Sequence, residues 1–347
     1  MSTMSLVTHL RQLSVSAKVL GLHTQLEFAT LRVEVSGTDR YFELEPEFAT
    51  FDPRGPREFS HQVLPQSRIF TGWRHAPKKS CAVSSDKRAF MAFCARNEVR
   101  TPRAYARFSE ATTNVVIKQV LPGVRGVIRG PFAPGCIPAD CLQPSADLIL
   151  QEFVTGHMLE AWYWDGQLFA VEIHNRPHVV GDGITATREL IACNSLSPGW
   201  IDWVAAEDAV RFQGATLETV LPAGKEVAVD IRFTSALQRP EPENVLNTLI
   251  GTPVHAQLLR AGSVFFHAIP ERIRRHTQFV LGAIIDAQQR LWFTDMTTDL
   301  RIHPDGYELM LRGLFGIPTP TPTPAPAPSP SATASLANAA PVSPVAS

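Results

Sequence analysis

The chain has 347 residues, of which 44% are hydrophobic and 19% are charged, and its 32 Lys and Arg nearly balance its 33 Asp and Glu. This length allows one large domain, or two to three small ones, with a substantial core. A net charge of −1 gives no support for a nucleic-acid partner or for binding to an acidic membrane surface. The five cysteines form no CxxC pair, which argues against a zinc ribbon and against a disulfide framework.

The start of the chain carries no sign of export or of membrane insertion. Met1–Gly21 lacks a basic segment followed by an apolar one, and the longest apolar run is Phe279–Ile285. Such a run is too short to cross a bilayer. We therefore expect a cytoplasmic protein that has no contact with membranes.

The proline content is concentrated at the C-terminal end. Ile317–Ser347 holds nine of the 28 prolines and no charged or aromatic residue. Alternating Thr-Pro and Ala-Pro pairs favour an extended polyproline II chain, and no large side chain is present to offset the entropy of ordering. We expect a disordered tail over residues 317–347, with a specific proline-motif ligand as the alternative.

The first predicted elements are strands followed by a helix. Alternation at Leu31–Val35 and Tyr41–Glu45 favours strands. Ser84 and Ser85 form a cap-type pair before Asp86–Val99, in which apolar residues recur on one helical face. The helix should end before the following Thr-Pro pair, because proline disfavours a helical backbone at the residue that precedes it.

A sheet is predicted in the middle of the chain. Val115–Lys118 is a short apolar strand, and a loop rich in Gly and Pro runs from Pro122 to Gly135. Further strands are indicated at 148–154, 160–164 and 167–173, and the Asp165-Gly166 pair between the last two is a strong signal for a two-residue hairpin turn.

The last third of the chain mixes strands with helices. A short helix with Thr187 as its cap is expected at Thr187–Ile191, whereas 193–224 is ambiguous and 225–234 alternates as a strand does. Residues 242–277 are predicted to be helical. Strands at Phe279–Ile285 and 290–296 flank a turn that begins at Asp286.

Two lysines lie where a positive charge needs a partner. Lys118 ends an apolar strand just before a glycine-containing loop, and Lys87 begins a helix. A buried ammonium is costly unless it meets an anion, and the loop adds Arg125, Arg129 and exposed backbone amides that could hold phosphate. A lysine that extends its ammonium to solvent at a strand end is the alternative reading.

Acidic residues gather near the last predicted strands. Asp295 lies at a strand end two residues before Thr297, and Asp299 follows. Carboxylates in such a place could hold magnesium together with the phosphates of a substrate, although a solvated strand end explains Asp295 equally well.

A third group lies in Arg176–Ile191, RPHVVGDGITATRELI. Gly181 and Gly183 around Asp182 permit a tight turn with positive φ. The run VVGDGITATRELI resembles the V-x-G-D-G-x-x-T-x-R-E-L-I signature of the ATP-grasp region of cyanophycin synthetases and related amino-acid ligases.

The resemblance extends in the same order over residues 83–316. It implies an α+β ATP-grasp fold, in which two α+β subdomains clasp ATP. A small N-terminal domain, residues 1–82, would precede it, and the tail, residues 317–347, would follow.

The resemblance also implies roles for individual residues. Lys118 and Arg232 would act on the phosphoryl group that is transferred, and Arg176 and His303 could face the substrate. The residues implied around ATP are Lys87, Lys118, Arg125, Gln151, Glu152, Phe153, Val154 and Glu160.

The chain departs from the family pattern at the metal site. Ile284 stands where the family has a carboxylate, and Asp295-Met296-Thr297 replaces a Glu-x-Asn pair. The metal ligands implied here are Asp295 and Thr297, with Asp299 as a compensating acid. Met158 replaces the acidic ribose ligand, although Glu160 is close to it in the chain.

The implied activity is an ATP- and Mg²⁺-dependent carboxylate–amine ligase that works through an acyl phosphate. The expected partners are an amino-acid or peptide substrate and a second copy in a homodimer, with no nucleic acid. Two alternatives remain open, namely a catalytically degenerate nucleotide-binding or regulatory protein and a metabolite-binding protein with another sheet fold.

Overall fold

The computed structural model describes residues 6–50, 59–62, 67–75, 79–120, 128–138, 141, 148–195, 201–231, 243–298 and 302–318. Short 3-10 turns lie at Phe108–Glu110 and Pro304–Gly306. The helices and strands in chain order are α1 Leu6–Val19, β1 His23–Leu26, β2 Val33–Ser36, β3 Tyr41–Thr50, β4 Phe59–Ser60, β5 Ser67–Arg74, α2 Ala82–Ser85, α3 Lys87–Arg96, β6 Ala104–Tyr105, β7 Val115–Gln119, β8 Ile128–Phe132, β9 Leu148–Glu152, β10 His157–Trp164, β11 Gln167–His174, β12 His178–Val180, α4 Thr187–Cys193, α5 Trp203–Phe212, β13 Glu226–Ala228, α6 Leu246–Leu249, α7 Pro253–Ala268, α8 Glu271–Arg274, β14 Gln278–Ile285, β15 Leu291–Thr297 and α9 Tyr307–Phe315.

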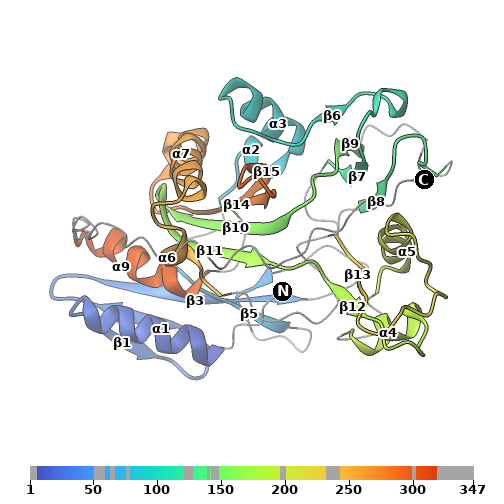
Figure 1. Cartoon of the computed structure of the whole chain (residues 1–347). Coiled ribbons are helices and arrows are strands. Elements are labelled where there is room, and N and C mark those ends of the chain that lie inside the picture. Colours follow the sequence, from blue (N-terminus) through green and yellow to red (C-terminus); the bar gives the residue numbers. More distant parts are fainter. Residues whose placement is uncertain are drawn as a thin grey trace.

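Within the described residues, the strands form four antiparallel sheets. The central sheet has the order β11-β10-β14-β15, and a second four-stranded sheet has the order β6-β9-β7-β8. The N-terminal strands make a five-stranded sheet, and β12 pairs with β13. Figure 1 shows the central sheet in the middle of the molecule, with the other sheets around it. The predicted α+β class is confirmed.

One face of the central sheet is covered by helices α3 and α7 (Figure 1). Phe90 of α3 and Phe265 of α7 stack with ring centroids 5.4 Å apart, and both pack against Leu159 and its neighbours on this face. In α7, apolar residues recur at helical spacing, as a helix that buries one side requires. The largest core of the molecule therefore lies between these helices and the sheet.

The N-terminal sheet has a core that includes the last helix. Leu13 of α1, Trp73 of β5 and Leu311 of α9 are fully buried in one cluster. Tyr307 connects its layers, because its hydroxyl lies 2.8 Å from Nδ1 of His9 and accepts a 3.1 Å hydrogen bond from the backbone N–H of Trp73. Helix α1 was not among the elements predicted from the sequence.

The expected helix after residue 85 is present as α3, but its cap differs from the prediction. The Asp86 side chain accepts hydrogen bonds from the backbone N–H groups of Arg88 and Ala89, at 2.6 and 3.1 Å. Ser84 and Ser85 belong instead to the short helix α2. A carboxylate satisfies the free amides of a helix start as well as a serine hydroxyl does, so either residue type fits the local pattern.

The predicted strands of the middle region are present, and the Asp165-Gly166 hairpin is confirmed. Both turn residues have positive φ, 47° and 84°, as a type I′ turn requires. The expected loop from Pro122 to Gly135 is partly wrong, because β8 lies within it and pairs with β7.

The glycine-rich motif forms a small unit with β12, β13, α4 and α5. Its core includes Val179, Ile191 and Val210. Thr187 begins helix α4 but does not cap it, since its hydroxyl donates instead to the carbonyl of Thr219 at 2.7 Å. Within the described residues, no helix combines the length and the apolar character needed to cross a membrane.

Candidate functional site

Lys118 lies at the end of β7 with its side chain half-buried. Its ammonium donates a 3.0 Å hydrogen bond to Oε1 of Gln151 on the neighbouring strand β9. Gln151 is 4% exposed, and its amide donates to the carbonyl of Pro102 at 3.2 Å. The side chain of Gln151 therefore holds Lys118 in a fixed position.

Lys87 and Asp295 lie close enough to Lys118 to affect its charge. Burial and the Lys87 ammonium lower the pKa of Lys118 from 10.5 to about 8, and the Asp295 carboxylate opposes that shift. Lys87 begins α3, and its backbone N–H donates to the carbonyl of Val120 just after β7. The ammonium groups of Lys118 on β7 and Lys87 on α3 thus both lie near the Asp295 carboxylate.

Asp295 is held over the central sheet by its neighbour on β14. Asp295 pairs with Gly282, whose backbone N–H hydrogen bonds the Asp295 carboxylate. A Cβ at position 282 would overlap Oδ1 of Asp295, so the carboxylate uses space that glycine leaves open. Burial raises the pKa of Asp295, with Glu160 acting in the same direction and the two lysines opposing.

The residues on this face allow a magnesium ion only in a restricted way. Gly282 pairs with Glu160 across the strand on its other side, so Glu160 and Asp295 flank it in one cross-strand row. Thr297 lies two residues further along β15 and shares this face, whereas Ile284 offers no ligand atom. The donors fit an ion held by Asp295, Glu160 and substrate phosphates, because Mg²⁺ prefers oxygen ligands and retains waters.

The predicted adenine-binding segment runs from the end of β9 towards β10. The backbone N–H of Glu152 donates to the Arg103 carbonyl at 2.8 Å, and that of Phe153 donates to the Asn114 carbonyl at 2.7 Å. These two amides are engaged in holding neighbouring segments. The Val154 carbonyl accepts from Arg176.

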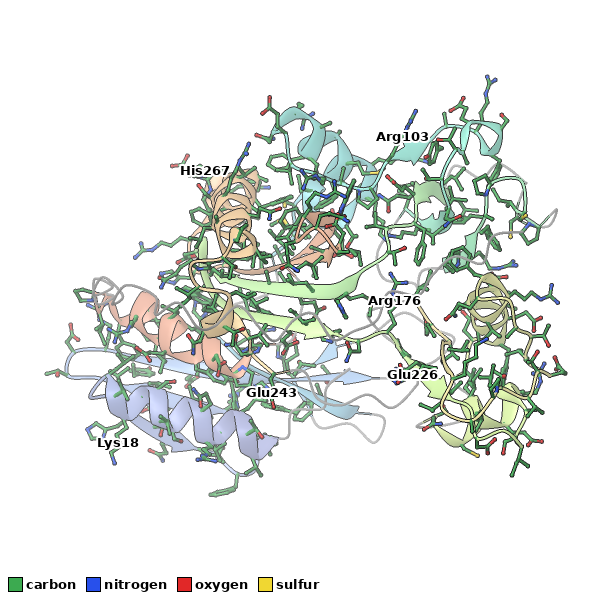
Figure 2. The ribbon with its side chains drawn as sticks, in the orientation of Figure 1. Lys18, Arg103, Arg176, Glu226, Glu243 and His267 are labelled. Atoms are coloured by element: carbon green, nitrogen blue, oxygen red, sulfur yellow. The ribbon has the colours of Figure 1, made fainter. Side chains whose placement is uncertain are left out.

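Arg176 joins the hinge to the glycine-rich motif. Its Nη2 donates to the Val154 carbonyl at 3.1 Å, and its guanidinium lies 4.7 Å from the ring centroid of Phe153. Figure 2 shows Arg176 where the central sheet runs on towards β12. Burial lowers the pKa of Arg176 to about 10, and its Nε has no hydrogen-bond partner among the described residues, so this cation could accept an anionic ligand.

His303 is 2% exposed and lies in the interior beside Trp162, with ring centroids 5.2 Å apart. Its Nε2 is 3.2 Å from Oε1 of Glu172, a fully buried residue of β11. His174, two residues further along β11, lies 3.2 Å from Glu160. Glu172 and His174 were not predicted, although a Glu and a His two residues apart in an apolar strand lie on one face.

Arg129, a second cation of the predicted phosphate loop, is paired elsewhere. Its Nε donates to Asp208 of α5 at 2.6 Å, and the backbone N–H of Gly130 donates to the same carboxylate at 3.0 Å. Arg129 therefore ties β8 to α5. Arg125, Arg232 and Asp299 lie outside the described residues, as does the predicted tail beyond Pro318.

Asp182 organises the turn of the glycine-rich motif. Its carboxylate accepts from the backbone N–H of Ile184 and of Thr185 and from the Thr185 hydroxyl, at 2.8, 2.7 and 2.5 Å. These bonds lower the pKa of Asp182 to about 2. In Figure 1, helix α4, which follows this turn, is well separated from β15.

No protein-family model matches the chain, and no curated protein matches it significantly. Among solved structures, it is similar to a bifunctional glutathione synthetase from Pasteurella multocida, with 12% identity, 89% of this chain and 43% of that chain covered, and a TM-score of 0.41. It is also similar to the VanG D-Ala:D-Ser ligase from Enterococcus faecalis, with 12% identity, 68% and 62% covered, and a TM-score of 0.39. A third is the ATP-grasp ligase PsnB complexed with minimal precursor, with 12% identity, 67% and 61% covered, and a TM-score of 0.33.

The chain spans less than two thirds of the length of each of these three ligases. At these identities and TM-scores the similarity assigns no residue, substrate or activity to this chain.

Proposed function

We propose that the chain is an ATP-grasp carboxylate–amine ligase, which joins an amino acid or peptide to an amine at the expense of ATP. The observation that carries this proposal is the convergence of Lys118, Lys87 and Asp295 between two sheets. Phosphoryl transfer needs little covalent chemistry from the protein and relies on charge neutralisation and alignment. Two lysines and a carboxylate at one point are suited to that task.

Lys118 would contact the phosphates of ATP. Gln151 already fixes its ammonium, so little side-chain freedom remains to be lost on binding. Because burial and Lys87 disfavour its charged form, a phosphate oxyanion would stabilise that form more here than at a solvated lysine. Asp295 and Glu160 would hold magnesium, which when bound supplies positive charge to the phosphates and aligns them.

The proposed reaction proceeds in two steps. A carboxylate oxygen of the substrate forms a bond to the γ-phosphorus while the bond from that phosphorus to the β-phosphate oxygen breaks, and ADP leaves. A neutral amine then attacks the acyl carbon, phosphate leaves, and the amine gives up a proton. Arg176 would orient the substrate carboxylate, as its buried Nε suggests. The cytoplasm is the proposed location, with residues 1–82, 83–316 and 317–347 as the proposed division of the chain.

The test measures formation of ADP when the protein is incubated with ATP, Mg²⁺ and an amino-acid mixture, and mass spectrometry identifies the products. Lys118→Ala should reduce the rate of ADP release by at least about 100-fold, because removal of one electrostatic contact to a transition state lowers a rate by about that factor. Lys18→Ala is the matched control, because Lys18 is exposed on α1. Equal activity of the wild type and Lys118→Ala would contradict the proposal.

A second candidate is a nucleotide-binding protein that does not catalyse ligation. It is favoured by Ile284, an aliphatic residue on the face where a second metal carboxylate is needed. This candidate requires ATP to raise the melting temperature without any release of ADP. The ligase requires both effects, so the two measurements together separate the candidates.

A further inference from the structure

A small pocket lies between the N-terminal sheet and the hairpin end of the central sheet. Its wall includes Arg74 and His75 at the end of β5, Trp164 at the end of β10, and His276 just before β14. A volume of about 30 Å³ is open there to the centres of water-sized molecules. This is more than the roughly 10–15 Å³ that one water requires. Among the described residues that line the pocket, none is proposed to contact ATP or magnesium.

Three side chains in the wall of the pocket carry hydrogen-bond donors that lack an acceptor among the described residues. Nη2 of Arg74 is buried without a partner, whereas Nε of the same guanidinium donates to Glu47 at 2.9 Å. Nε2 of His276 accepts from Nε of Arg275 at 3.1 Å, so the proton of the neutral ring is on Nδ1 and remains available. His75 contacts His276 through its ring, with centroids 5.6 Å apart, and its N–H is also available.

Lys79 adds a positive charge to the same wall. Its ammonium donates to the backbone carbonyls of Arg275 and His276 and to the Thr277 hydroxyl, at 2.5, 2.9 and 3.0 Å. All three acceptors are neutral, so within the described residues no carboxylate contacts this ammonium. Arg275 is exposed beside it and adds a further positive charge.

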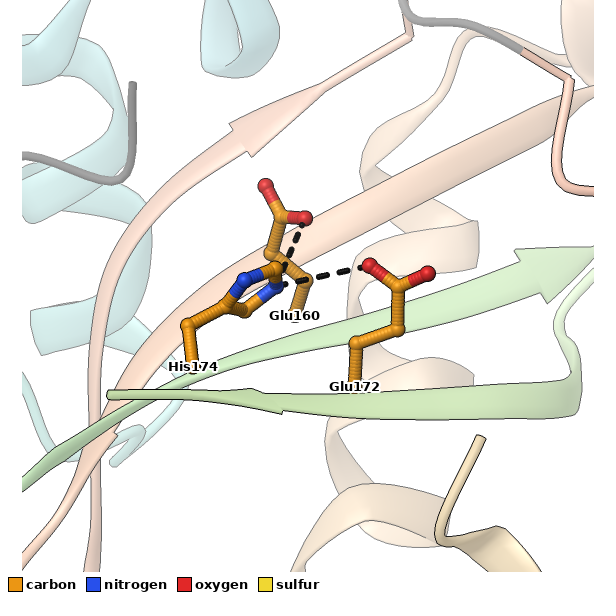
Figure 3. A group of neighbouring side chains, drawn as sticks. All are labelled: Glu160, Glu172 and His174. Atoms are coloured by element: carbon orange, nitrogen blue, oxygen red, sulfur yellow. Dashed lines mark ion pairs between the residues drawn. The ribbon is translucent and has the colours of Figure 1, made fainter. Parts of the chain in front are cut away.

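The described wall of the pocket contains no acidic side chain. Asp165, in the nearby hairpin turn, accepts from the backbone N–H of Thr277 at 2.8 Å. Further along the central sheet, Glu160 and Glu172 face His174 (Figure 3). Donors and positive charges are therefore in excess at this pocket, which is the composition that an anion requires.

The two imidazoles are affected by this excess of positive charge. Burial, His276 and Lys79 lower the pKa of His75 to about 4. Burial lowers the pKa of His276, Asp165 opposes that shift, and Arg275 and Lys79 add to it. An anion in the pocket would favour the protonated imidazoles, so its binding should take up protons and become stronger as the pH falls.

We propose that this pocket binds one tetrahedral oxyanion of the sulfate or phosphate class. Its oxygens would accept from Nη2 of Arg74 and from the ring N–H groups of His75 and His276, while the nearby ammonium group supplies positive charge. The donors come from two separate segments, and an ion with four oxygens can accept from several directions at once. The small volume admits a free ion or a terminal phosphate group rather than a whole nucleotide.

The experiment is isothermal titration calorimetry of the full chain with sulfate at constant ionic strength. One ion should bind per chain. His75→Phe and His276→Phe each remove a ring N–H while keeping a ring of similar size, and each should weaken binding by at least about tenfold. His267→Phe makes the same change at an exposed histidine of α7, labelled in Figure 2, and should bind as the wild type does. Circular dichroism should show that the variants are folded.

Acidification tests the part played by the imidazoles, because sulfate keeps its charge between about pH 5.5 and about pH 7.5. The affinity of the wild type should rise by about tenfold on going from the higher to the lower pH, since an imidazole gains a proton on binding. His75→Gln keeps a donor but cannot titrate, so its affinity should rise clearly less. A wild-type affinity that does not change with pH would contradict binding at the imidazoles.

Two further measurements locate the ion and identify its source. Lys118→Met removes the ammonium proposed to contact ATP and should retain sulfate binding within about twofold. Loss of binding in Lys118→Met with wild-type affinity in His75→Phe, or no binding to the wild type, would overturn the site. Inorganic phosphate should displace sulfate, and equal displacement by glycerol phosphate would show that the site also accepts the phosphate group of a larger ligand. Sulfate binding is measured without ATP, so its failure and the failure of ADP release are separate results.

Discussion

Gly282 and Asp295 are cross-strand partners, and the Asp295 carboxylate occupies the space where a side chain at position 282 would lie. The backbone N–H of Gly282 hydrogen bonds the carboxylate that lies over it. The acid is thereby kept near Lys118 and Lys87 rather than extending away from the sheet. A glycine inside a β-strand is otherwise unfavourable, so its place opposite Asp295 has a structural reason.

Gly282→Ala should therefore displace the Asp295 carboxylate. We expect a loss of about 1–3 kcal/mol in the free energy of unfolding, as for other overpacked positions, and a loss of ADP release. Urea denaturation measures the first effect. In the Asp295→Ala background, Gly282→Ala should lower the free energy of unfolding by clearly less, because the carboxylate that the new methyl group overlaps is absent. Equal losses in both backgrounds would contradict this account.

The stability of the chain should depend on pH through Lys118. Its folded-state pKa, about 8, lies below its usual 10.5, so between these values the unfolded chain binds more protons than the folded one. The free energy of unfolding of the wild type, relative to Lys118→Met, should rise from about pH 8 to about pH 10.5 and be constant below about pH 7. The wild type relative to Lys18→Met, a substitution at an exposed position, should show no such rise. A fall over this range for the wild type relative to Lys118→Met would refute the assignment.

Asp208→Ala should lower the free energy of unfolding strongly, although Asp208 lies far from Lys87 and Lys118 in the sequence. The substitution leaves the Arg129 guanidinium and the Gly130 N–H without their shared carboxylate. Removing one partner of such a buried pair costs about 3–5 kcal/mol. The adjacent Glu207→Ala breaks the Arg211 pair, in which Arg211 is 67% exposed, and should cost less than about 1 kcal/mol in the same denaturation experiment.

Tyr307→Phe should loosen the attachment of the last helix to the N-terminal sheet. It removes the hydroxyl that His9 and the Trp73 N–H share, and leaves the buried backbone donor unsatisfied. We expect a loss of about 1–3 kcal/mol in the free energy of unfolding. Tyr41→Phe, at a residue that is 63% exposed, is the control, and an equal effect of both would show that the hydroxyl contacts contribute nothing.

The features predicted correctly from the sequence are those encoded locally. The Asp165-Gly166 turn needs only two residues with positive φ, and strand β7 needs only its apolar run. The cap of α3 was placed at Ser84 and Ser85 instead of Asp86, because several neighbouring residues can satisfy a helix start.

The features missed from the sequence depend on partners distant in the chain. Arg129 was expected at a phosphate, and its actual partner, Asp208, lies in a stretch that gave no pattern. The Glu160 and Glu172 pair follows from the register of β10 and β11, which includes a bulge at Trp162. Such registers are set by tertiary packing, which single-sequence patterns do not contain.

The contact of α9 with α1 has a consequence for biosynthesis. His9 and Tyr307 are 298 residues apart, and Leu13 shares its core with Leu311. Domains generally fold as units, beginning with the N-terminal one, while the ribosome is still adding residues. Here α9 completes the core of the N-terminal sheet, so part of the apolar surface of this sheet stays open until nearly all of the described chain has emerged. An apolar surface exposed for that long favours aggregation of the nascent chain.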